Sequence, residues 1–440
     1  MQGISESKRT KIMTFERNPS DVGKKHFFSR KVRLILFFVI VAMVILLNVA
    51  AWNSAPFCDW YIAHIFPIWV NTYGRLTGLF PFSVGEWLIL AGLLLVAMAV
   101  ILPIVWGAAE LVTRLRCRLE NRRREEESKE AGGGSAPASL RRFIKGFYRF
   151  FVWTLLTVCL VMTLNCFILY HASTFSQRYF GGGEEEYTLE ELMAVYNRVA
   201  EECLRLSEEI QRDENGRALY SGSKGKSGQT LDMADKAREL MVRLGETYDQ
   251  LEGYYPRPKA LLSSDFMCQQ YMCGYYFPFS MEANYNDVMY VLNKPATMCH
   301  ELAHLRGFIY EDEANFVAYL ACVESDDAFF RYAGNLSVLV YLYNDLYRAW
   351  QADPEGYALA AEKMRPISVT DQVWEDDTFV LQEEWDRINK KALIDTEVVD
   401  QASDVFIDTN LKVNGISDGS VSYSRVVKLL LQYYRSKSFR

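Results

Sequence analysis

Histidine is scarce in this sequence, with only five residues among 440. Positive charge is also in short supply, because 48 lysines and arginines face 55 aspartates and glutamates, a formal net charge of −7. The C-terminal two-thirds have no long basic stripe, so the chain is not expected to bind nucleic acid. Nine cysteines are too few for a dense disulfide scaffold in a chain of this length. The length suits a membrane module and one sizeable domain.

Two of the five histidines fall in the run His300-Glu301-Leu302-Ala303-His304. This spacing puts both imidazoles on one face of a helix, where they can bind one zinc ion. Glu301, beside the first histidine, can then act as general base on water activated by the metal. The alternative is a helix that carries two histidines by chance, but the flanking residues favour the zinc interpretation.

The flanks of this run are typical of a helix that is followed by a turn. Pro295 suits the first turn of a helix and Gly307 suits the position after its end, so we expect a helix from about Pro295 to Arg306. A second helix should begin soon after the glycine, and acidic residues crowd its start, where the helix dipole favours negative charge. A carboxylate of this cluster is the expected third zinc ligand.

Two glutamates compete for the role of third ligand. The run Glu311-Asp312-Glu313-Ala314-Asn315 resembles the Glu-x-x-Ala-Asp pattern of membrane-bound gluzincin proteases, in which the first glutamate binds zinc. This resemblance implies Glu311 as the ligand and Asn315 as a residue behind the ligands that contacts them. Glu313 stays the alternative ligand. The metzincin pattern would place the third ligand at Tyr310, and tyrosine is a poor substitute there.

The longer run CHELAHLRGFIYEDEANFVAYLAC resembles a bacterial membrane-protein family catalogued as domain of unknown function 3810. The runs FPFSMEANYN and SYSRVVKLLL resemble the same family, and the resemblance covers most of the chain. It implies a zincin-like peptidase domain preceded by three membrane spans, and it supplies no substrate.

Three apolar runs are long enough to cross a membrane, at about residues 32–51, 82–106 and 150–170. A signal peptide is the alternative for the first run, but that run is longer than the usual apolar core of a signal peptide. Basic residues mark the N-terminal tail and the loop 107–149 as cytoplasmic, so everything after the third span should lie outside. We therefore expect a cytoplasmic tail (1–31), a membrane module with a flexible basic loop (32–170), and an extracytoplasmic zincin-like domain (171–440).

The C-terminal domain should be mainly helical (mainly α, α+β) with a small strand element. Thr188 and Glu191 form a capping box at the start of a helix over 184–211. Phe277 to Phe279 and Asn284 to Leu292 look extended, and the family resemblance implies that Tyr285 to Leu292 is the edge strand beside the zinc helix. Further helices are expected over residues 230–252, 326–350, 354–364, 372–394 and 423–434.

Four cysteines of this domain lie in two pairs that could form disulfides outside the cytoplasm. These pairs are Cys268 with Cys273 and Cys299 with Cys322. Cys299 adjoins His300, but it points about 100° away from it around the helix, so core packing is its expected role.

These observations predict a zinc-dependent metallopeptidase, multi-pass in the cell membrane, that acts on a peptide or protein outside the cytoplasm. The alternatives are a non-enzymatic zinc- or peptide-binding sensor on the same fold and another amide hydrolase, and the intact Glu301 favours an enzyme. An intramembrane protease would need an apolar run of about 20 residues around the histidines, and Lys294 and Arg306 interrupt it. Tyr310 and Tyr285 are candidates for stabilising an oxyanion.

Overall fold

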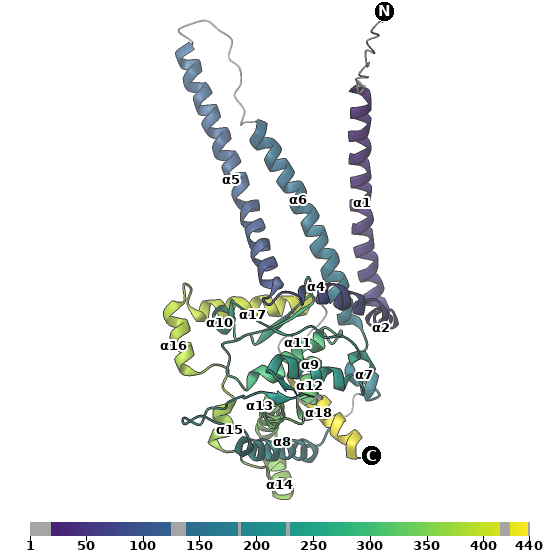
Figure 1. Ribbon diagram of the computed structural model, residues 1–440, viewed down its shortest axis with the longest axis vertical. Helices are drawn as coiled ribbons and strands as arrows, with labels where there is room; N and C mark the ends of the chain where they lie inside the picture. Colours follow the sequence, from purple (N-terminus) through teal and green to yellow (C-terminus); the bar gives the residue numbers. More distant parts are fainter. Residues whose placement is uncertain (1–18, 125–137, 184–185, 226–228, 414–422, 439–440) are drawn as a thin grey trace, which may run out of the picture.

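The computed structural model describes residues 19–124, 138–183, 186–225, 229–413 and 423–438. The predicted cytoplasmic tail therefore lies outside the described residues as far as residue 18. Three long helices stand together at one end of a mostly helical body (Figure 1). They are α1 (Pro19–Asn53), α5 (Val84–Arg124) and α6 (Ala138–Met162).

Each of these helices belongs to a segment long and apolar enough to cross a membrane: Lys31–Asn53, Val84–Leu119 and Ala138–His171. Their apolar side chains face outward, as expected for contact with lipid; Leu93 and Ile104, for example, are 63% and 67% exposed. Hydrogen bonds link the helices to one another, because Tyr148 Oη donates to the Ala99 carbonyl (2.6 Å) and Asn48 Nδ2 donates to Thr163 Oγ1 (3.0 Å). The three predicted apolar spans are confirmed.

The basic segment 107–149, expected to be a flexible loop, is helical over most of its length. Helix α5 continues to Arg124 and α6 begins at Ala138, so only residues 125–137 lie outside the described part. Arginine, leucine and glutamate, which dominate this segment, are good helix formers, so the helices continue past the apolar runs.

Short helices connect α1 to α5. Helix α2 (Ala55–His64) is capped by Ser54, whose hydroxyl accepts from Phe57 N (3.3 Å). Then follow α3 (Phe66–Trp69), the π-helical turn η1 (Val70–Gly74) and α4 (Arg75–Thr77). In Figure 1, α2 and α4 lie between the long helices and the body.

The body is built around two buried helices, α11 (Asn293–His304) and α12 (Glu311–Val323), joined by a turn. Helix α13 (Ala328–Ala352) packs against α12 and against α8 (Leu189–Glu209), and α9 (Met233–Leu244) packs against α11. The remaining helices are α7 (Phe175–Tyr179), α10 (Ser264–Gln269), α14 (Pro354–Met364), α15 (Asp371–Asp376), α16 (Gln382–Lys391), α17 (Thr396–Val413) and α18 (Tyr423–Ser438).

The strand element is small, as predicted. One sheet has the order β3-β5-β4, built from β3 (Lys259–Ala260), β5 (Glu282–Tyr285) and β4 (Gly274–Phe277). Strand β3 is parallel to β5, and β4 is antiparallel to it with Gly274 opposite Tyr285 and Phe277 opposite Glu282. A second pair joins β1 (Ser223–Lys224) to β2 (Thr230–Leu231). The prediction of a mainly α fold with a small strand element is confirmed.

The prediction of an edge strand from Tyr285 to Leu292 is wrong. The strand ends at Tyr285, and it is the central strand of its sheet. Beyond it, the Asn286 side chain accepts from Val288 N (3.0 Å), a local turn that ends the extended conformation. The strand that combines an edge position with contact to α11 is β4.

Among the other expected helices, some agree with the structure and others have different bounds. The capping box of Thr188 and Glu191 is present at the start of α8. The helix expected over 230–252 shortens to α9 and a 3₁₀ turn, η4 (Asp249–Leu251), and the one over 372–394 divides into α15 and α16.

Candidate functional site

The predicted histidine helix and the acidic helix after it are brought face to face by a tight turn. Helix α11 ends at His304, and Gly307 then adopts a φ of +86°, a conformation that favours glycine. Helix α12 begins at Glu311, so its first carboxylate returns to the histidine face of α11.

His300, His304 and Glu311 form one compact cluster. One ligand atom from each of the three lies within 4.8 Å of the others, a grouping that could hold a metal ion. The Nε2 atoms of the two histidines are 3.1 Å apart. His300 Nε2 is 3.0 Å from Glu311 Oε2, and His304 Nε2 is 3.8 Å from Glu311 Oε1. The Glu311 side chain is half exposed, so the cluster opens to solvent.

The Nδ1 atom of each imidazole contacts an oxygen atom, and these two contacts orient the rings. His304 Nδ1 lies 2.7 Å from the Phe308 carbonyl oxygen, which can only accept, so this nitrogen carries the proton. His300 Nδ1 lies 2.8 Å from Asn315 Oδ1, one turn along α12 from Glu311. Such partners fix the orientation of both rings and turn their Nε2 atoms toward one another. Asn315 therefore lies where the sequence pattern predicted it.

The pKa values of His300, His304 and Glu311 depend strongly on one another's charge. Desolvation alone would lower the pKa of His300, but the hydrogen bond to Glu311 and its negative charge raise this pKa to about 9. For Glu311, desolvation alone would raise the pKa, and the bond to His300 outweighs it and lowers the pKa to about 2. Burial and then the charge of His300 lower the pKa of His304 to about 4. A positive charge on His300 is thus stabilised by the ionised Glu311, whereas His304 is held neutral.

Glu301 is buried against strand β4. The residue is 4% exposed, and burial raises the pKa of its carboxyl to about 8, although the Tyr276 backbone N–H donates to it. Its Oε2 atom has no hydrogen-bond partner in the part of the chain that the structure describes. A Cβ on Gly274 would lie 2.8 Å from Glu301 Oε1 and 2.5 Å from the Asn284 carbonyl oxygen. Glycine is therefore required for this close approach of strand and carboxylate.

Glu313, the alternative third ligand, is placed elsewhere. Its Oε1 accepts from Phe175 N of α7 (2.5 Å), and burial raises the pKa of its carboxyl to about 8. It therefore joins α12 to α7 and takes no part in the cluster.

The tyrosines considered for an oxyanion do not join the cluster either. Tyr310 Oη donates to the Tyr170 carbonyl oxygen (2.6 Å), and Tyr285 lies on β5 with Lys294 near its ring. A residue that sequence reasoning missed is Tyr276 of β4, whose ring centroid is 6.1 Å from that of His304. The only sequence feature that marks Tyr276 is its place in the aromatic run Tyr275 to Phe277.

Neither of the two possible disulfides is formed. All nine cysteines are free, and Cys299 and Cys322 lie buried with their thiols in contact where α11 packs on α12. Core packing is the arrangement found for Cys299, as expected.

These features define a helical membrane protein with two imidazoles and one carboxylate gathered at a helix–turn–helix. Residues 61–431 match the family model described as protein of unknown function (DUF3810), and the chain belongs to that family. No curated protein and no solved structure matches the chain.

Proposed function

We propose that this protein is a membrane-anchored zinc metallopeptidase. The observation that carries the proposal is the cluster of His300, His304 and Glu311 beside the buried carboxylate of Glu301. Two imidazoles and one carboxylate are a donor set that catalytic zinc takes, with a further position open to water or substrate. The fit is supported by the two Nδ1 contacts, which direct both Nε2 atoms to the same point.

Zinc bound there would supply Lewis acidity that activates water and polarises the scissile carbonyl. Glu301 would take the proton from the attacking water and deliver it to the leaving amine. The unpartnered Oε2 atom is the one free to receive that proton.

Strand β4 is the expected support for the peptide backbone. It pairs with β5 on one side, and its other side is an edge of the sheet. An extended peptide can add to such an edge through main-chain hydrogen bonds. Because β4 contacts Glu301 at Gly274 and Tyr276, a peptide paired with it would pass the cluster.

The test uses the full chain, purified in detergent and loaded with zinc, with a diverse peptide mixture and mass spectrometry of the products. We expect cleavage by the wild type and a loss of about 100-fold or more in Glu301→Gln. Glu301→Gln should still bind one zinc, because Glu301 is not in the donor set. A folded, zinc-loaded wild type that cleaves nothing would favour a zinc- or peptide-binding sensor, and equal cleavage by both proteins would reject Glu301 as the base.

We also propose that the body lies outside the cytoplasm. In Figure 1 the N-terminal end of α1 and the far ends of α5 and α6 lie away from the body. The arginine-rich end of α5 is at that far end, and basic segments of this kind stay in the cytoplasm.

A further inference from the structure

The first turn of the second membrane helix is bound directly to the sheet beside Glu301. The backbone N–H groups of Val84 and Gly85 donate to the two oxygens of Glu282 on β5 (3.1 and 2.8 Å). A Cβ on Gly85 would lie 2.9 Å from the Phe277 ring, so α5 and the end of β4 are in close contact. The Phe277 end of β4 therefore lies at the membrane-facing side of the body.

The end of the third span touches the same hairpin. Asn165, in the π-helical turn η2 (Thr163–Phe167), donates from Nδ2 to the Pro278 carbonyl (2.9 Å), and its own carbonyl accepts from Tyr276 Oη (3.1 Å). The Tyr276 ring is next to His304, with 6.1 Å between centroids. A single side chain thus separates the third span from a residue of the cluster.

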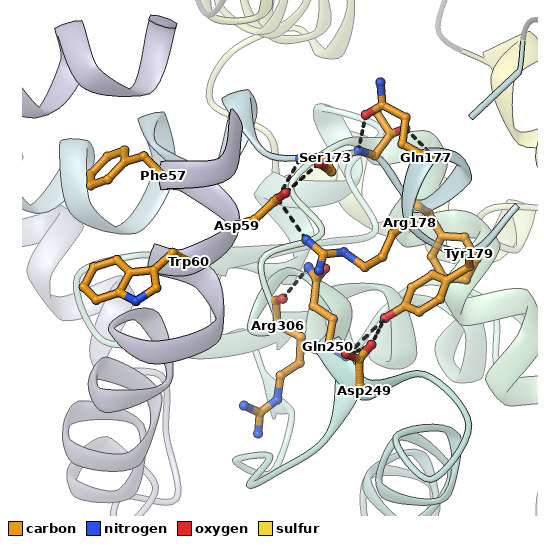
Figure 2. A network of polar contacts seen from close by, with 12 residues as sticks. Phe57, Asp59, Trp60, Ser173, Gln177, Arg178, Tyr179, Asp249, Gln250 and Arg306 are labelled. Atoms are coloured by element: carbon orange, nitrogen blue, oxygen red, sulfur yellow. Dashed lines mark hydrogen bonds and ion pairs between the residues drawn. The ribbon is translucent and has the colours of Figure 1, made fainter. Parts of the chain in front are cut away.

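A third attachment comes from α2, which follows the first span. Figure 2 shows Asp59 pointing from α2 to Ser173 and Arg178, with Asp59 accepting from Ser173 N (2.9 Å), Ser173 Oγ (2.6 Å) and Arg178 Nη2 (2.9 Å). The same network reaches the turn after α11, since Gln250 Nε2 donates to the Arg306 carbonyl (2.9 Å). The body is therefore clamped to the membrane module at three places, and its site has a fixed height above the bilayer.

The geometry points to a substrate that is itself anchored in the bilayer, and this inference rests on the proposed peptidase function. Strand β4 runs from Phe277, at the membrane helices, to Gly274, at Glu301. Three residues of strand span roughly 10 Å. A peptide paired with β4 would therefore leave the membrane surface and meet the cluster after a short, fixed length of chain. Anchoring would also raise the effective concentration of that chain at the site.

The experiment uses the full zinc-loaded protein in phosphatidylcholine vesicles and cysteine-containing peptides from a protein digest. One half of the peptides is coupled through cysteine to maleimide-bearing lipid, and the other half is capped with N-ethylmaleimide and left free. We expect the anchored peptides to be cleaved about ten-fold faster or more. Their cut sites should gather within roughly five to ten residues of the anchored cysteine.

Coupling the same peptides through a long poly(ethylene glycol) spacer is the matched control, because it keeps the anchor and removes the fixed distance. With the spacer, the gathering of cut sites should be lost. Equal cleavage of free and anchored peptides, or cut sites independent of the anchor, would overturn the inference and leave the peptidase proposal standing. Cleavage of neither set by the zinc-loaded protein would reject the peptidase proposal itself and the inference with it, whereas cleavage that persists in Glu301→Gln would reject only Glu301 as the base.

Discussion

The two glutamates of the acidic run differ in what they contact, although only Asp312 separates them. Glu311 reaches His300, whereas Glu313 accepts from the backbone of α7. The helical rotation between them separates the two carboxylates, so one sequence run serves two purposes. This difference can be tested with a matched pair of isosteric substitutions.

Glu311→Gln should weaken zinc binding by about 100-fold or more, because loss of an outer contact alone typically costs 10–100-fold and this residue is a proposed ligand. Glu313→Gln should leave zinc affinity within a few fold, since a glutamine oxygen can still accept from Phe175 N. Competition with a chromogenic chelator measures both affinities. If Glu313→Gln lost zinc and Glu311→Gln kept it, the assignment of the third ligand would be reversed.

Sequence reasoning reached these residues because their chemistry is local. Two histidines one turn apart, a glycine turn and an acidic helix start are written within a few residues, and short-range geometry places them. Strand β4 was not predicted as the edge beside the site, because its position depends on contacts distant in sequence. Gly274 fits under Glu301, and Phe277 packs against Gly85 of α5. The sequence from Gly274 to Phe277 carries no pattern that predicts contact with Glu301 or Gly85.

At the scale of elements, the junction of α5 with the sheet contains a buried ion pair. Lys259 Nζ lies 2.5 Å from Glu282 Oε1 and also donates to the carbonyls of Thr77 (2.7 Å) and Phe82 (3.0 Å). The two charged side chains are 6% and 1% exposed. A buried pair of this kind stabilises little in itself, but removing one partner leaves a buried charge unpaired.

Lys259→Met should therefore lower the free energy of unfolding by about 3–5 kcal/mol. The double variant Lys259→Met/Glu282→Gln should lose less than the sum of the single changes, because no uncompensated charge remains. Chemical unfolding in detergent micelles, followed by tryptophan fluorescence, measures this cycle. Strict additivity of the two changes would contradict the coupling.

The end of α15 offers a pH test away from the cluster. Asp376 pairs with Arg212 (2.6 Å) and accepts from Tyr332 Oη (2.6 Å), whereas burial raises the pKa of the neighbouring Asp377 carboxyl to about 7. The unfolded chain has an aspartate pKa of about 3.9. The folded state therefore holds more protons between these values, and stability falls as the pH rises from about 4 to about 7.

Asp377→Asn removes this titration while keeping the shape of the side chain. The melting temperatures of wild type and variant should differ least below about pH 4, where Asp377 is protonated in both the folded and the unfolded state. The wild type should lose stability relative to the variant as the pH rises from about 4 to about 7, and the difference should then level off. Thermal unfolding over a pH series measures the difference. A constant difference across the series would show that Asp377 does not titrate in this range.

At the scale of the whole molecule, three spans place the two ends of the long helices on opposite sides of a membrane. Leu393, between α16 and α17, is fully exposed on the body, and Ser139 is exposed at the start of α6. In a Cys117→Ser background, a membrane-impermeant maleimide applied to intact cells should label Leu393→Cys. Ser139→Cys should react only after permeabilisation, because the basic segments hold that end in the cytoplasm. The opposite labelling pattern would place the body in the cytoplasm.

Helix α5 has a consequence at this scale. Its 41 residues measure roughly 60 Å at 1.5 Å per residue, about twice the 30 Å thickness of a bilayer core. Its first turn is held by Glu282, and its last turn reaches well beyond the lipid on the other side. The helix therefore connects the two sides of the membrane as well as anchoring the body. One continuous helix, which contains Pro103, joins the arginine-rich end on one side of the membrane to Glu282 of β5 on the other.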